Sequence, residues 1–337
     1  MLKFDRELFV QALNEGALGK RGELERVVDE ISGKGFSNIF LIGSGGTVAM
    51  MYPFEYIFKS YSALPVRAEI AAELLVTDNR QLTSKSVCIF ASVTGTTKET
   101  VAAAQFCREK GATTIGLVGI PGTPLAEAVD YAITFGREKH AFDVFYLQLQ
   151  ILTTRFLQQN GEFPQYEQFA AELAALPQGM VAAMEEFDAR AEAFAIKHRE
   201  TDYHMLVGAG NLWGNTYSYA MCILEEMQWI KSKSIHAAEF FHGTLELVEK
   251  DTSVILFKGE DATRPLVERV ERFAENITKE LFIIDTKDYA LPGISEEFRK
   301  LVDLNVNWAL TSRISAYLER ERNHPLEIRR YYRKMEY

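Results

Sequence analysis

Short apolar runs and longer amphipathic segments alternate along the first part of the chain. The runs SNIFLIG, SVCIFAS and TTIGLVG begin at residues 37, 86 and 113 and consist mainly of Val, Ile, Leu and Phe. Because polar residues do not alternate within them, they are typical of strands that helices cover on both faces. The segment Lys98–Lys110 has a helical pattern between the second and third runs. Helices between such strands predict right-handed crossovers and a parallel sheet.

The same rhythm returns in the second half of the chain. Apolar runs over residues 202–208, 253–259 and 280–286 are accompanied by helical patterns over Tyr217–Trp229 and Pro265–Asn276. Self-similarity at a fixed separation is the signature of a duplicated fold. The separations between three pairs of corresponding positions agree within three residues: Gly43 with Gly208, Ser86 with Ser253, and Thr113 with Leu281.

The repeat therefore predicts an α/β protein with two tandem, doubly wound parallel-sheet domains. We assign residues 1–150 to the first domain and residues 201–337 to the second. Residues 151–200 are rich in Ala, Leu, Glu and Gln, which predicts a helical linker. The last nine residues contain three Tyr and four basic residues, so we expect a C-terminal tail that docks on the folded protein.

The composition excludes several classes of protein. A chain of 337 residues, 47% of them hydrophobic, can bury a core without disulfide bonds. Its net charge of −10 repels nucleic acid and anionic lipid, which excludes both as partners. No stretch of about 18 uncharged apolar residues is present to span a membrane. Cys88, Cys107 and Cys222 lie in apolar surroundings, which predicts buried thiols and a cytoplasmic location.

The loop from Ser92 to Thr97 is the first candidate for a binding site. Ligands bind beyond the carboxyl ends of parallel strands, and this loop joins such an end to a helix. Free backbone amides, the positive end of the helix dipole and hydroxyl groups together bind phosphate. An ordinary Ser/Thr helix cap would give the same local sequence. The hydroxyl groups of the loop belong to four residues: Ser92, Thr94, Thr96 and Thr97.

A second glycine-rich loop follows the first predicted strand. Gly45, Gly46 and Thr47 could support the same anion from the neighbouring strand, although the glycine spacing does not match a dinucleotide-binding loop. In the second repeat the corresponding loop reads GEDATRPLV, with two acidic residues and a proline. We therefore expect one of the two domains to hold phosphate.

Ionisable residues concentrate at and after the predicted helix Tyr217–Trp229. Carboxylate and imidazole groups in one region suit proton transfer beside a carbonyl. A metal site fits poorly, because His236 and His242 are six positions apart and do not share a helix face. A capped turn or a solvated face is the alternative for any single residue. The acidic and histidine residues of this region are Glu225, Glu226, His236, Glu239, His242 and Glu246.

These motifs resemble those of a known family. SVTGTTKET and the paired glycine-ended domains resemble the SIS (sugar isomerase) family of phosphosugar-binding proteins. EEMQWIKSKSIHAAEFFHG and the ending ERNHPLEIRRYYRKMEY are similar to the fructosamine 6-phosphate deglycases within that family. The resemblance covers nearly the whole chain. It implies a deglycase that converts a sugar-phosphate amino acid conjugate into glucose 6-phosphate and the free amine.

The resemblance also implies roles for particular residues. Glu226 corresponds to the family's base and His242 to its catalytic histidine, which in the related isomerase domain of glutamine–fructose-6-phosphate amidotransferase comes from the partner subunit. This implies a homodimer or a higher homo-oligomer with shared sites. Lys334 corresponds to a lysine that closes over the sugar. The phosphate ligands correspond to Thr47, Ser92, Thr94 and Thr97, and neither a cofactor nor a metal is implied.

Two other functions are compatible with the same residues. A phosphosugar aldose–ketose isomerase or an amino-sugar 6-phosphate deaminase would use the same Glu and His. A non-catalytic phosphosugar sensor is the alternative of another class, since SIS domains also occur in regulators. The chain has no basic DNA-binding segment beside the domains, which favours an enzyme.

Overall fold

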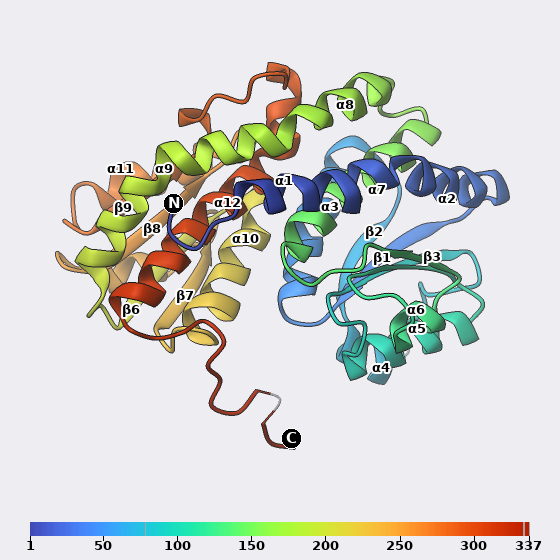
Figure 1. Ribbon diagram of the computed structural model, residues 1–337, viewed down its shortest axis with the longest axis horizontal. Helices are drawn as coiled ribbons and strands as arrows, with labels where there is room; N and C mark the ends of the chain where they lie inside the picture. Colours follow the sequence, from blue (N-terminus) through green and yellow to red (C-terminus); the bar gives the residue numbers. More distant parts are fainter. Residues whose placement is uncertain (78, 333, 337) are drawn as a thin grey trace. The chain divides into compact units, whose positions relative to one another are not determined.

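The computed structural model describes residues 1–77, 79–332 and 334–336 (Figure 1). The chain forms two compact units. The N-terminal unit contains Asp5–Gln178 and Gly293–Phe298, and the C-terminal unit contains Met1–Phe4, Gly179–Pro292 and Arg299–Tyr337. The part of the chain that the structure describes has no helix long and apolar enough to cross a membrane.

The N-terminal unit is built on a five-stranded sheet in the order β2-β1-β3-β4-β5. Every neighbouring pair in this sheet is parallel. All seven residues of β3 are buried, as expected for a strand with helices on both faces. The strands are β1 (Asn38–Gly43), β2 (Val66–Ile70), β3 (Ser86–Ser92), β4 (Thr113–Val118) and β5 (Tyr131–Thr134).

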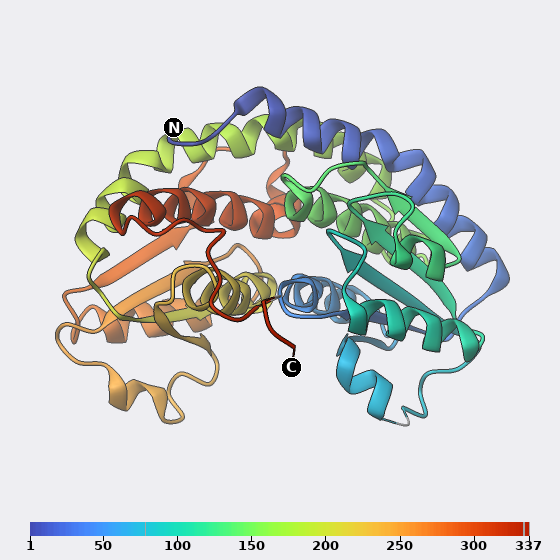
Figure 2. The same ribbon diagram turned by 60° about the horizontal axis from the view of Figure 1, so that its bottom comes forward.

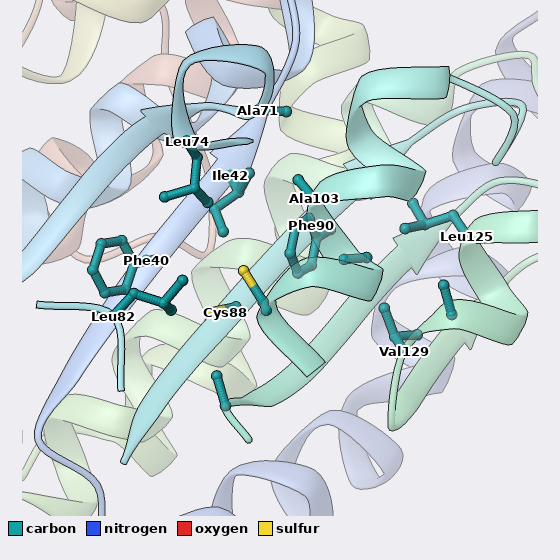
Figure 3. Packing of buried hydrophobic residues seen from close by; sticks show 14 of the residues in the cluster. Phe40, Ile42, Ala71, Leu74, Leu82, Cys88, Phe90, Ala103, Leu125 and Val129 are labelled. Carbon is teal, nitrogen blue, oxygen red and sulfur yellow. The ribbon is translucent and has the colours of Figure 1, made fainter. Parts of the chain in front are cut away.

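Helices cover this sheet and supply the core. On one side Phe40 of β1 and Phe90 of β3 pack with Leu74 and Ala103 from the helices (Figure 3). Cys88 belongs to the same cluster and is a free, buried thiol. The helices of the unit are α1 (Arg6–Gly16), η1 (Leu18–Lys20), α2 (Arg21–Lys34), α3 (Gly46–Tyr61), α4 (Ala71–Val76), α5 (Lys98–Glu109), α6 (Pro124–Ala128), α7 (Ala141–Gln159), α8 (Tyr166–Glu172) and η2 (Leu173–Ala175).

The C-terminal unit contains a four-stranded parallel sheet in the order β7-β6-β8-β9. The strands are β6 (Tyr203–Gly208), β7 (Lys231–His236), β8 (Ser253–Lys258) and β9 (Leu281–Asp285). The other elements are α9 (Leu176–His198), η3 (Gly210–Leu212), α10 (Trp213–Ser218), the π-helix η4 (Tyr219–Glu225), η5 (Thr244–Leu247), α11 (Arg264–Ala274), η6 (Thr286–Asp288) and α12 (Glu296–Glu321). Helices α9 and α12 each begin in the N-terminal unit and continue into the C-terminal unit, at Gly179 and Arg299.

The two sheets confirm the predicted pair of doubly wound parallel-sheet domains. Strands β2, β1, β3 and β4 follow the same order as β7, β6, β8 and β9. All six strands that the apolar runs predicted are present, and α5 and α11 lie within two residues of their predicted ends. The edge strands β2, β5 and β7 were not predicted. They are mostly half-buried or exposed, so their sequences lack a continuous apolar run.

The predicted helix over Tyr217–Trp229 differs from the structure. Helix α10 ends at Ser218 and a π-helix follows to Glu225, after which Trp229 takes a positive φ of 54°. A positive φ is uncommon for a residue other than glycine, and at Trp229 it ends the helical conformation of the backbone. Periodicity cannot distinguish an α-helix from a π-helix over so few residues, because the two differ by one residue in their hydrogen-bond spacing.

Candidate functional site

The loop after β3 is organised by the buried hydroxyl of Ser92. Its Oγ accepts a hydrogen bond from the backbone N–H of Gly95 at 3.0 Å and lies 3.3 Å from Oγ1 of Thr97. Gly95 has a φ of 65°, and a Cβ there would lie 2.0 Å from Oγ1 of Thr123. The loop therefore needs a serine at one end and a residue without a side chain in its middle.

The threonines of this loop leave the start of α5 open. Thr97 occupies the N-cap position, but its side chain makes no capping hydrogen bond. Oγ1 of Thr94 and Oγ1 of Thr96 lie 2.8 Å apart, and Thr96 is exposed. Because the first amides of a helix have no intrahelical partner, an uncapped N-terminus attracts an anion. This geometry favours a phosphate-binding loop over an ordinary helix cap.

The loop after β1 lies beside the first one. Ser44 Oγ is 3.2 Å from Oγ1 of Thr100, which joins the loop after β1 to the first turn of α5. Thr47 Oγ1 donates to the carbonyl of Ser44 and accepts from its N–H, both at 3.0 Å, so this hydroxyl shapes its own loop. Gly45 has a φ of 57° at the N-cap of α3, and Gly46 is the first residue of that helix. Neither Ser44 nor Thr100 was predicted as a site residue, because their contact joins residues 56 positions apart.

The corresponding loop of the second repeat carries its own anion. Asp261 Oδ2 accepts a hydrogen bond from the backbone N–H of Asn211 at 2.7 Å. Its Oδ1 accepts from the N–H and the hydroxyl of Thr263, the N-cap of α11, at 2.6 Å each. The Asp261 carboxylate thus accepts hydrogen bonds from the backbone amides to which a phosphate would otherwise bind. This supports the expectation that one of the two domains holds phosphate.

A buried carboxyl group lies beside Asp261. Asp303 accepts a hydrogen bond from the backbone N–H of Glu260 at 2.8 Å. Burial, together with the nearby Asp261 carboxylate, raises the pKa of Asp303 well above its usual range. This part of the loop is therefore filled by protein groups.

Glu226 follows the π-helix and lines an open pocket of the C-terminal unit. Its Oε1 accepts a hydrogen bond from Nε of Arg329 in the C-terminal tail at 2.7 Å. Burial raises the pKa of the neighbouring Cys222 to about 11, so this thiol stays protonated at neutral pH. The pocket, of about 620 Å³, is lined by Glu225, Glu226, Trp229, Ile230, Lys231, Ser232, Arg329, Arg330, Tyr331 and Tyr332.

The tail docks where the π-helix ends. After α12 it runs past the helices of the C-terminal unit (Figure 2). Gln228 Nε2 donates to the carbonyl of His324 at 2.7 Å, and the His324 ring lies 4.4 Å from the ring of Trp229. The Arg330 guanidinium lies 3.9 Å from the centre of the same indole. The expected docking is therefore confirmed. Lys334 itself donates to the carbonyl of Arg329, a contact within the tail.

His242 lies elsewhere on the C-terminal unit. It is exposed in the turn after β7, where its backbone N–H donates to the carbonyl of Glu239 at 3.0 Å. Gly243, with a φ of 136°, follows it. In the described part of the chain, no hydrogen bond or ion pair joins the side chains of His242 and Glu226. A group of three His, Cys, Asp or Glu residues that could hold a metal ion is likewise absent from the described residues.

Comparison with known proteins identifies the family. A model of the SIS domain matches residues 34–157. Fructosamine deglycase FrlB of Bacillus subtilis (strain 168) is 35% identical over 323 residues, which cover 94% of this chain and 97% of that protein. A crystal structure of a Bacillus subtilis protein described as a candidate phosphosugar isomerase has a TM-score of 0.89 at 32% identity and covers 97% of this chain and 99% of its own.

The chain therefore belongs to the SIS domain family and is a homologue of a fructosamine deglycase. Fructoselysine 6-phosphate deglycase of Escherichia coli (strain K12) is a more distant relative, at 22% identity over 91% of this chain and 88% of that protein. The C-terminal domain of glucosamine-fructose-6-phosphate aminotransferase from Francisella tularensis shares the fold, with a TM-score of 0.77 at 14% identity. The predicted fold and family are confirmed.

Proposed function

We propose that this protein is a fructosamine 6-phosphate deglycase. The observation that carries the proposal is the likeness to fructosamine deglycase FrlB over nearly the full length of both chains. An uncapped hydroxyl-rich loop in the N-terminal unit and a carboxylate in an open pocket of the C-terminal unit are the two chemical features that the reaction needs. The proposed substrate is a 6-phosphorylated fructose carrying an amino acid or another amine at C1.

The phosphate group binds the loop between β3 and α5 in this proposal. Hydroxyl groups and the first amides of α5 donate hydrogen bonds to it, and the helix dipole favours its charge. These local donors are needed because the protein as a whole carries a net charge of −10. The proposed contacts come from Ser92, Thr94, Thr96 and Thr97, with Thr47, Gly45 and Gly46 in support and Lys334 near the sugar.

The proposed reaction moves one proton between neighbouring carbon atoms. His242 assists opening of the sugar ring, which exposes the C2 carbonyl. Glu226 removes a proton from C1 and returns it to C2, so that the double bond moves to C1 and the nitrogen. Water then adds to this C1 imine and releases glucose 6-phosphate and the free amine. The adjacent carbonyl and nitrogen take up the electron pair, so the mechanism uses neither a cofactor nor a metal.

Replacing Glu226 tests the proposal. Glu226→Gln keeps the size of the side chain and removes the base, so turnover should fall by about 10²–10⁴-fold. Binding of glucose 6-phosphate should remain, because the phosphate loop is unchanged. Both are measured by coupled glucose 6-phosphate detection and by titration calorimetry. Glu249→Gln, an exposed position in the turn before β8, is the control and should keep wild-type turnover.

The choice of substrate separates this function from its alternatives. A 6-phosphofructosyl amino acid and glucosamine 6-phosphate are supplied in parallel, and glucose 6-phosphate and fructose 6-phosphate are assayed. The proposed deglycase releases glucose 6-phosphate from the first compound. Fructose 6-phosphate from the second would instead identify a deaminase. Thermal stabilisation by phosphosugars without any turnover would identify a sensor.

A further inference from the structure

Arg329 in the C-terminal tail makes the ion pair that holds Glu226. Its Nε donates to Oε1 of Glu226 at 2.7 Å. Its Nη1 donates to the backbone carbonyls of Leu326 and Ile328, so the guanidinium is fixed to the tail's own backbone. The exposed fraction is 16% for the Arg329 side chain and 30% for Glu226. The pair is thus sheltered at the edge of the pocket while the carboxylate still reaches solvent.

The second oxygen of Glu226 is left for another role. Within the described part of the chain, Oε2 of Glu226 has no hydrogen-bond partner. A charge-assisted hydrogen bond to one carboxylate oxygen holds that oxygen in place, and the other oxygen can then accept a proton. General bases require such placement, since proton transfer needs heavy atoms within hydrogen-bond distance.

Contacts on both sides of Arg329 fix its position independently of Glu226. His324 is held by Gln228 at 2.7 Å, and Arg330 stacks 3.9 Å from the centre of the Trp229 ring. Glu226 is itself held in the π-type pattern, with its backbone N–H donating to the carbonyl of Met221 at 3.0 Å. The backbone of both Arg329 and Glu226 is therefore held by contacts other than the ion pair itself.

We propose that Arg329 is a positioning residue for Glu226, orienting its carboxylate for proton removal at C1. The inference rests on the proposed function, in which Glu226 is the base. Arg329 acts through Glu226 and does not itself exchange a proton. In this proposal the C-terminal tail contributes to catalysis by orienting Glu226.

The test compares Arg329→Met with Arg329→Lys in the full-length enzyme. Arg329→Met removes the donor and should lower kcat by about 10–100-fold, while KM changes by less than about threefold, because a misplaced base affects the chemical step more than binding. Arg329→Lys restores one donor and one charge and should recover part of kcat. Arg320→Met is the control, since it removes other Arg–Glu ion pairs of the same unit, with Glu192 at 2.7 Å and Glu321 at 2.6 Å.

Thermal unfolding of each variant separates positioning from a loss of fold. A folded Arg329→Met enzyme with wild-type kcat overturns the inference, and so does a higher kcat, which would mean that the ion pair inhibits Glu226. Equal effects of Arg329→Met and Arg320→Met would assign a general structural role and also overturn it. Glu226→Gln is assayed alongside. If that variant keeps its turnover, the proposed base fails and the inference fails with it, whereas an inactive Glu226→Gln with a normal Arg329→Met refutes the inference alone.

Discussion

Gly95 shows how far the phosphate loop depends on one residue without a side chain. The backbone there has a φ of 65°, and the space for a Cβ is already filled by Thr123. The buried N–H of Gly95 donates to Ser92, and its carbonyl accepts from the N–H of Leu125 at 3.0 Å. The glycine in the motif was predictable from sequence because a tight loop needs it, but the contact with Thr123 comes from another strand–helix connection.

Substitution of Gly95 should disrupt the loop. Gly95→Ala adds a Cβ that clashes with Thr123 and strains a left-handed backbone, so affinity for glucose 6-phosphate should fall by about tenfold or more. Gly122→Ala is a matched control, because Gly122 has a similar φ of 67° but open space around a new Cβ. Calorimetric titration of both variants checks the effect, and equal affinities would show that the close approach is irrelevant to binding.

At the scale of elements, an apolar sequence made six strands predictable, among them β9 at the edge of its sheet, whereas the edge strands β2, β5 and β7 were not predicted. β6 reads as an almost continuous apolar run, whereas β7 has the sequence KSKSIH, in which the first four residues are polar. β7 is nevertheless the counterpart of β2, since both lie beside the first strand of their repeat. Its place depends on pairing with β6, which no pattern within its own six residues reveals.

The burial of β6 also affects the protonation of His204, which lies within this strand. Its Nδ1 lies 2.7 Å from Oγ of Ser253 in β8, and the side chain is fully buried. Burial lowers the pKa of His204 to about 3, with His198 and Arg322 adding repulsion. The folded protein therefore keeps this imidazole neutral, whereas the unfolded chain protonates it near pH 6.5.

Because of His204, the free energy of unfolding should decrease as the pH is lowered. Because the pKa of His204 is lower in the folded protein than in the unfolded chain, protonation favours unfolding. The contribution of His204 to the free energy of unfolding is therefore fully present above pH 6.5 and is lost as the pH falls toward 3. Between pH 6.5 and pH 5 the loss should be about 2 kcal/mol. Urea unfolding of the wild type and of His204→Gln over this range measures it. The variant should show a shallower decline, and parallel curves for the two proteins would contradict the assignment.

At the scale of the whole molecule, the two repeats share a fold but differ in the loops that follow β3 and β8. The N-terminal unit keeps an open helix N-terminus after β3, while the C-terminal unit has filled its equivalent with Asp261. Glu226 and His242 both belong to the C-terminal unit, yet the described structure shows no contact between their side chains. We therefore propose a homodimer in which His242 of one subunit serves the site that contains Glu226 of the other.

Mixing inactive subunits should restore activity under this arrangement. When Glu226→Gln and His242→Ala proteins are unfolded, combined and refolded, random pairing makes half of the dimers hybrid. Each hybrid has one intact site, so about a quarter of wild-type turnover should return. Glu226→Gln mixed with the Glu226→Gln, His242→Ala double variant is the control and should remain inactive. Absence of recovery in the first mixture would assign both residues to the same subunit's site.

The sequence by itself determined the six strands with apolar sequences, the repeat and the hydroxyl-rich loop. These features depend on burial and on backbone conformation over a few consecutive residues, and both leave a local pattern. Tertiary structure decided which groups meet. Arg329 reaches Glu226 across 103 positions, and Asp261 reaches the amide of Asn211 across 50. These pairs form because of the strand order and the place where the tail docks. Their partners are far apart in the sequence, so no local pattern in either segment predicts the contact.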